Sequence, residues 1–273
     1  MNVDGCELRL ARRFCGPPGA ANGGFACGSL AALLGGTVEV TLRRPLPLER
    51  PLGVRRDGDG ILLLEDDGRL LAAARPSATE VELTVPDAPT PEEARSAAGR
   101  AAYYGDPLFP DCFVCGPARA PCDGLRIFPG PVPGRLVWAA PWTPDSSVSG
   151  PDGQVRNEVA WAALDCPGGV AAVEAAAIPT DTAVLLGQMT ARLAARLRIG
   201  TEYQAVAWLL GRDGRKLSAA SALLGPDGEV LAAARALWVT VPRAALTPAA
   251  EPSTRWGGQP PGTVIRKTAG GTV

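Results

Sequence analysis

Each half of the chain combines one long apolar run with several short ones. The long runs are residues 25–34, preceded by Asn22-Gly23-Gly24, and residues 159–164, preceded by Asn157-Glu158. An asparagine side chain can accept hydrogen bonds from the free N–H groups of a first helical turn. Each long run is therefore predicted to be a helix that begins after its asparagine.

The short apolar runs are bounded by Gly, Pro, Asp or Asn, which is typical of strands. In each half, one predicted strand precedes the helix and about four follow it. The predicted strands are residues 7–12, 37–42, 52–56, 61–65 and 70–85 in the first half, and residues 125–128 with 135–139, 188–197, 203–210, 217–224 and 230–241 in the second. One helix against one antiparallel sheet is an α+β layer arrangement.

An internal repeat relates the two halves. Residues 67–75 read DGRLLAAAR and residues 227–235 read DGEVLAAAR, so seven of nine positions are identical at an offset of 160. An Asp-Gly pair between two apolar runs is a hairpin turn signal. The repeat therefore predicts two copies of one module.

The predicted modules are residues 1–86 and 112–246. Residues 87–111 read as a linker in which Thr90-Pro91-Glu92-Glu93 forms a capping box, so a short helix over about 91–103 is expected. Residues 247–273 are rich in Pro, Gly and Thr and are expected to be a flexible tail.

The composition limits the chemistry. The chain has 273 residues, a formal net charge of −1 and no histidine. Without histidine there is no Ser-His-Asp triad, Cys-His dyad or His-bound metal. Near-neutral charge gives no reason to expect a nucleic-acid partner. No apolar run reaches the roughly 18 residues of a membrane span, and the N-terminus lacks the shape of a signal peptide, so a cytoplasmic protein without a membrane partner is expected.

Cys112 and Cys115 are separated by two residues, a spacing found in metal and redox sites. A zinc site needs four ligands, and Cys122 is the only further thiol nearby in the sequence. A redox pair would be expected at a helix start in a thioredoxin-like setting. We therefore expect no metal and no cofactor, and we assign the pair a packing role at the first strand of the second module.

Four motifs together resemble the tandem (double) hotdog acyl-CoA thioesterase-like family. They are the Asn22-Gly23-Gly24-Phe25 helix start, the Leu42-Arg43-Arg44-Pro45-Leu46 strand end, the Asp-Gly strand in both halves, and Cys112-Phe113-Val114-Cys115-Gly116 followed by Gly124-Leu125. The resemblance implies a double hotdog fold of class α+β, in which an antiparallel sheet wraps one helix per module. It also implies hydrolysis of an acyl-CoA or acyl-carrier thioester.

Asp165 is the candidate catalytic residue. A carboxylate in an apolar helical stretch is costly to bury without partners, which favours a site or a polar network. By resemblance, Asp165 acts as general base on water with help from a Gln and a Thr or Ser on neighbouring strands. The last strand offers Ala236-Leu237-Trp238 where the family often has Gln, so Gln188 or Thr190 is expected to assist instead. The other interpretation is that Asp165 ends the helix before Pro167.

The N-terminus of the first helix is the candidate substrate-binding site. Asn22 is expected to cap it, and the free N–H groups of Gly23 and Gly24 would polarise a thioester carbonyl. The simpler interpretation is a capped helix that packs closely against the sheet.

Two other functions are known for proteins that this chain resembles in fold. A non-catalytic protein that binds acyl thioesters or lipids is the alternative, favoured by the missing strand Gln. A dehydratase of this fold uses a catalytic His, which this chain lacks. The sequence leaves open the acyl chain length, the carrier and the oligomeric state, and a homodimer is allowed.

Overall fold

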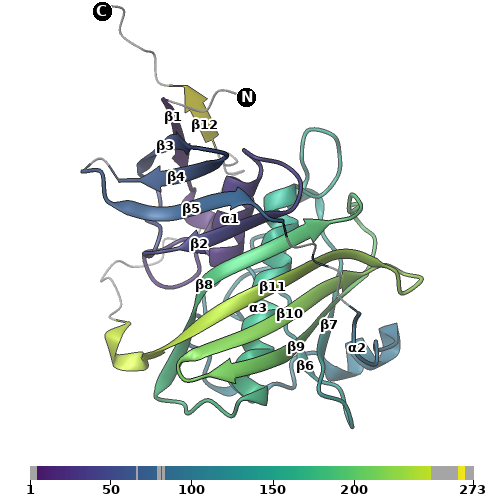
Figure 1. Cartoon of the computed structure of the whole chain (residues 1–273). Helices are drawn as coiled ribbons and strands as arrows, with labels where there is room; N and C mark the ends of the chain where they lie inside the picture. The colour runs from purple at the N-terminus through teal and green to yellow at the C-terminus, as the bar shows by residue number, and fades with distance from the viewer. Residues whose placement is uncertain (1–4, 66, 79–80, 82–83, 247–263, 268–273) are drawn as a thin grey trace, which may run out of the picture.

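The computed structural model describes residues 5–65, 67–78, 81, 84–246 and 264–267, whose strands join into one antiparallel sheet (Figure 1). The strands are β1 (Cys6–Arg9), β2 (Val38–Leu42), β3 (Pro51–Asp57), β4 (Gly60–Leu64), β5 (Leu70–Pro76), β6 (Gly130–Pro131), β7 (Trp138–Trp142), β8 (Thr182–Leu193), β9 (Tyr203–Asp213), β10 (Lys216–Leu224), β11 (Val230–Pro242) and β12 (Val264–Lys267). The α-helices are α1 (Gly23–Ala31), α2 (Pro91–Ala97) and α3 (Asn157–Ala175). Single 3-10 turns lie at Arg12–Phe14, Ala102–Gly105, Ser146–Val148 and Arg243–Ala245.

The two halves of the sheet repeat one strand order. The described strands run β12-β1-β3-β4-β5-β2-β8-β11-β10-β9-β7-β6. In the first half the strand before the helix, β1, is followed by β3, β4, β5 and β2. In the second half β7 is followed by β9, β10, β11 and β8 in the same way. The halves meet where β2 pairs with β8, with Val38 opposite Ala191 and Thr41 opposite Gln188.

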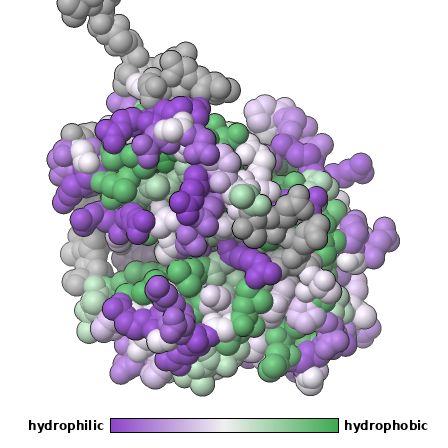
Figure 2. All heavy atoms as spheres, in the orientation of Figure 1, coloured by the Kyte–Doolittle hydropathy of each residue, from purple (hydrophilic) through white to green (hydrophobic). Residues whose placement is uncertain are grey.

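Both long helices lie behind the sheet in Figure 1, with α1 against α3. Two glycines allow this close approach. A Cβ on Gly24 would lie 2.4 Å from Asp165 Cβ, and a Cβ on Gly28 would lie 2.6 Å from Glu158 Cα. The helices therefore pack backbone against backbone at the point where Asp165 sits. The opposite face of the sheet, seen in Figure 2, carries polar and apolar residues side by side.

Three phenylalanines anchor the start of α1 to the second half. The Phe14 and Phe25 rings stack with centroids 3.8 Å apart, and Phe113 meets Phe14 edge-on at 5.0 Å. All three side chains are completely buried. Because Phe113 belongs to the Cys112–Gly116 segment, this aromatic contact fixes that segment beside α1.

Several predicted elements differ from the structure. Helix α3 does not end at Asp165 but continues through Pro167 to Ala175, buried on most sides. Burial of the helix outweighs the hydrogen bond that Pro167 cannot donate. Residues 112–116 form a turn-rich loop rather than a strand. Of the strand predicted before α3, residues 125–128 are not a strand, whereas residues 135–139 overlap β7.

The linker and the tail also differ in part. The capping box is confirmed, since Thr90 Oγ1 accepts from Glu93 N–H and the Glu93 carboxylate accepts from Thr90 N–H, but α2 ends at Ala97. Within the predicted flexible tail, β12 pairs with β1, with Arg9 opposite Val264. The rest of the tail lies outside the described residues. No described helix is long and apolar enough to cross a membrane.

Candidate functional site

A cavity of about 600 Å³ lies between the start of α1, one side of α3 and the strands β8 and β11. Its wall is mostly apolar. The lining positions on α3 recur at helical spacing: Asp165, Cys166, Gly169, Val170 and Val173. The cavity therefore follows α3 from Asp165 toward its C-terminal end, over about 12 Å to Val173.

Asp165 lies at the contact of the two helices and lines the cavity, with only 2% of its surface exposed. Its Oδ2 accepts hydrogen bonds from Gly24 N–H at 2.8 Å and from Asn22 Nδ2 at 3.1 Å. Its Oδ1 is covered and has no hydrogen-bond partner among the described residues. A buried oxygen without a partner is costly to the fold, which marks Asp165 as a candidate functional residue.

The surroundings of Asp165 change its affinity for protons. Burial raises the pKa of this carboxyl because the charged form loses solvation, and the nearby Cys112 side chain raises it further. The hydrogen bonds from Gly24 and Asn22 offset part of that rise, and the resulting pKa is about 7. A carboxyl with a pKa near neutrality can both take up and give back a proton at physiological pH.

Asn22 serves two elements at once. Its Oδ1 accepts from Phe25 N–H at 2.9 Å and so caps α1, as predicted. Because the amide oxygen is held by the cap, the Nδ2 group points the other way and donates to Asp165. The cap therefore fixes the orientation of the donor that holds the carboxylate.

The backbone N–H groups of Gly23 and Gly24, the two glycines of the predicted substrate site, have different surroundings. The N–H of Gly24, expected to face a carbonyl, donates to Asp165 instead. Gly23 lines the cavity, and its N–H has no partner among the described residues. A Cβ at Gly23 would lie 2.8 Å from Leu186 Cδ2, so the Leu186 side chain would have to shift to make room for it.

Gln188 and Thr190 do not lie beside Asp165. On β8 they flank Met189, which is fully buried in the core, so both side chains point to the other face of the sheet. Gln188 Nε2 donates to Thr41 Oγ1 at 3.1 Å on the neighbouring strand, and neither residue lines the cavity. The expectation that one of them assists Asp165 is not met.

Strand β11 contributes Trp238, Val239 and Val241 to the cavity wall, and Trp238 is the largest of them. Its indole Nε1 is buried without a partner among the described residues. A Cβ on Gly169 would lie 2.8 Å from the Trp238 ring, so Gly169 makes room for the indole. The glycine pair after Pro167 is the sequence signal for this contact, although it was assigned to a helix end.

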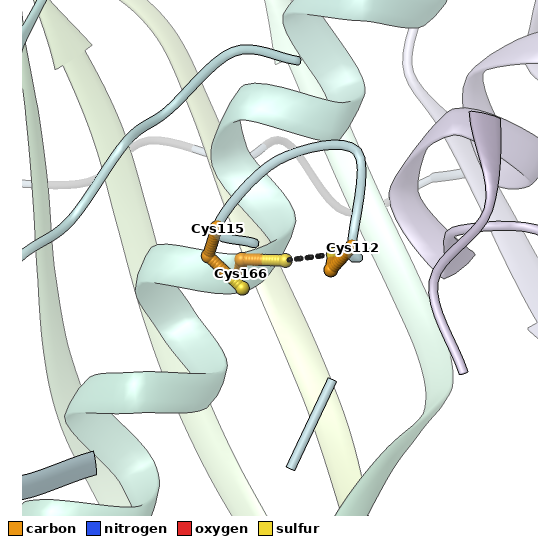
Figure 3. A group of neighbouring side chains, drawn as sticks. All are labelled: Cys112, Cys115 and Cys166. Carbon is orange, nitrogen blue, oxygen red and sulfur yellow. Dashed lines mark hydrogen bonds between the residues drawn. The ribbon is translucent and has the colours of Figure 1, made fainter. Parts of the chain in front are cut away.

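Three cysteines converge beside Asp165 (Figure 3). Cys112 and Cys115 come from the 112–116 loop and Cys166 from α3, and all three line the cavity. Their sulfur atoms lie within 4.8 Å of one another, with Cys112 Sγ and Cys166 Sγ 3.6 Å apart. The pair assigned to packing is thus part of a three-thiol cluster, whose third member is the residue next to Asp165.

Comparison with solved structures identifies the fold. The tesB protein of Mycobacterium avium subspecies paratuberculosis covers 87% of this chain and 92% of its own length, with 13% identity and a TM-score of 0.54. A protein from Lactobacillus plantarum assigned as an oleoyl thioesterase covers 87% and 96%, with 13% identity and a TM-score of 0.49. No protein-family model and no curated protein matches the sequence. At this identity, the similarity to the tesB protein shows that this chain has the same hotdog-like fold.

Proposed function

We propose that this protein hydrolyses acyl thioesters, carried on coenzyme A or an acyl carrier, with Asp165 as the general base. The observation that carries the proposal is a buried carboxylate at the end of a 600 Å³ apolar cavity, held through one oxygen and unpartnered at the other. The hotdog-like fold shared with the tesB protein agrees with this reaction class.

The proposal treats residues 1–86 and 112–246 as two hotdog modules joined by residues 87–111. It is supported by the strand order that repeats on either side of the β2–β8 contact. Pairing β2 with β8 also covers two strand edges that would otherwise be exposed. The cavity then lies where the modules meet.

In the proposed reaction Asp165 Oδ1 takes a proton from water while the water oxygen attacks the thioester carbonyl. Collapse of the tetrahedral adduct breaks the C–S bond, and the departing thiolate takes the proton back from Asp165. Gly24 and Asn22 hold Oδ2, so the carboxylate can change charge without changing position. Because Oδ1 is covered, a neighbouring group must shift when substrate and water arrive.

The carbonyl oxygen needs a donor as negative charge develops on it. We assign this role to the Gly23 N–H, at the positive end of the α1 dipole and on the cavity wall. The acyl chain would extend along α3 past Gly169 and Val170 toward Val173.

The alternative is a protein that binds acyl thioesters without hydrolysing them. Two observations favour it: Oδ1 is covered, and Gln188 and Thr190 lie on the far face of the sheet. On this interpretation, the cavity is a binding site and Asp165 a structural link between α1 and α3.

One experiment separates the two functions. Acyl-CoA substrates of increasing chain length are incubated with the protein, and loss of thioester absorbance is followed so that the seven cysteines do not interfere. We expect hydrolysis by the wild type, a loss of about 10²–10⁴-fold in Asp165→Asn, and full activity in Glu158→Gln on the same helix. Saturable binding without turnover by the wild type would establish the alternative, and full activity in Asp165→Asn would reject the proposed base.

A further inference from the structure

The cysteine cluster has the dimensions of a metal site. The three sulfur atoms all lie within 4.8 Å of one another, and Cys112 Sγ and Cys166 Sγ are 3.6 Å apart. Sulfurs bound 2.3 Å from a tetrahedral zinc ion would lie about 3.8 Å apart. All three residues are free cysteines, so all three sulfurs are available as ligands.

The loop that supplies two of the sulfurs is tightly built around them. Gly116 N–H donates to Cys112 O at 2.9 Å, and a Cβ on Gly116 would lie only 2.5 Å from Cys112 N and O. The loop is tied to the following segment by Leu125 N–H to Phe113 O and Ile127 N–H to Val114 O. The two sulfurs are therefore held on a rigid turn.

Asn22 places an amide donor beside the cluster. Asn22 Nδ2 lies 3.6 Å from Cys166 Sγ and 3.9 Å from Cys112 Sγ. Hydrogen bonds of this kind orient thiolate ligands around a metal.

We propose that Cys112, Cys115 and Cys166 bind one zinc ion as thiolates and leave its fourth position open to the cavity. Zinc with three protein ligands keeps one position for an exchangeable ligand. The three cysteines line the cavity, so water or a soft ligand such as a thiolate can reach that position. Binding releases the protons of the thiols that are still protonated. The site stands independently of the proposed hydrolysis, since it needs only the three sulfurs.

The sequence analysis predicts no metal here because Cys122 is the only further thiol near Cys112 and Cys115 in the sequence. Cys122 is exposed and is not part of the cluster. The third sulfur, Cys166, lies 54 residues from Cys112 in the sequence and is brought in by α3. The expectation of no metal thus rested on counting ligands close in sequence rather than in space.

The test measures metal rather than turnover. The full-length protein is purified under reducing conditions with zinc supplied, and its zinc content is determined by mass spectrometry. We expect one zinc ion per chain in the wild type, in Cys27→Ser, a buried cysteine outside the cluster, and in exposed Cys122→Ser. In Cys115→Ser and Cys166→Ser the affinity for zinc should fall by more than about 100-fold. A loss of roughly 100-fold is the most that is expected when a residue that only hydrogen-bonds to a metal ligand is removed.

Two measurements on the wild type need no substitution. Cobalt bound in place of zinc should give the intense sulfur-to-metal absorption bands of a three-thiolate site. A mercurial that blocks thiols should release the zinc to a chromogenic chelator. The proposal is overturned if the reduced wild type binds no zinc, if the mercurial leaves zinc bound, or if Cys166→Ser binds zinc as tightly as Cys122→Ser.

Discussion

The amide nitrogen of Gly24 lies 2.8 Å from Oδ2 of Asp165, joining the first turn of α1 to the middle of α3 across 141 residues of sequence. The contact needs glycine at position 24, since any side chain there would overlap Asp165. The proposed catalysis and the packing of the two helices therefore depend on the same few atoms.

Gly24→Ala should destabilise the fold. Its Cβ would lie 2.4 Å from Asp165 Cβ and 2.8 Å from Trp161 O, so the helices must move apart. We expect a loss of about 1–3 kcal/mol in the free energy of unfolding, measured by urea denaturation. Gly168→Ala is the matched control, because a Cβ there meets only ordinary contacts at 3.7 and 3.9 Å. It should gain up to about 1 kcal/mol, and equal losses in both variants would contradict the packing argument.

Asn22→Ser should separate the two roles of Asn22. Serine caps a helix about as well as asparagine but cannot reach Asp165. We expect the free energy of unfolding to fall by about 1–2 kcal/mol, from loss of the hydrogen bond to a charged group. Thioester hydrolysis should fall at least tenfold, because Oδ2 loses one of its two donors. An unchanged rate would show that Gly24 alone positions the carboxylate.

Val173→Trp should shorten the range of acyl chains that are hydrolysed. Val173 lines the cavity about 12 Å along α3 from Asp165. A larger side chain there should lower kcat/KM at least tenfold for long chains and leave short chains unaffected. Val173→Ala should show no such loss for long chains. A uniform loss across all lengths in Val173→Trp would mean that the acyl chain lies elsewhere.

Arg13→Met should lower the free energy of unfolding far more than the loss of an exposed arginine does. Arg13 is 4% exposed and donates to the carbonyl oxygens of Cys122, Asp123 and Ser147. Removing it leaves these acceptors without their donor, so thermal or urea unfolding should show a loss of about 2–5 kcal/mol. Arg9→Met breaks only an exposed pair with Glu49 and should cost less than about 1 kcal/mol. Equal effects would show that the buried network adds nothing.

Local signals along the chain predicted most of the fold. Asn22, the Asp-Gly turns and the capping box at Thr90 act within a few residues, so the pattern alone identifies them. The end of α3 was predicted too early because Pro167 is a strong local signal, and burial against the sheet overrides it.

The candidate site was predicted only in part, because it depends on contacts between distant segments. Asp165 stood out as a charged residue in an apolar run. Gln188 was placed wrongly because the face on which a strand residue lies depends on register, and β8 carries an irregularity between Gln188 and Leu186 opposite β11. Cys166 carried no signal, since nothing local relates it to Cys112.

The strand order repeats across the sheet, but the two helices have diverged. Asp165 is the ninth residue of α3, and the ninth residue of α1 is Ala31, which is also buried. Two identical halves would have formed two equivalent pockets related by a two-fold axis. With a carboxylate at this position on α3 and no acidic residue on α1, this chain should saturate at a stoichiometry of one acyl ligand per polypeptide.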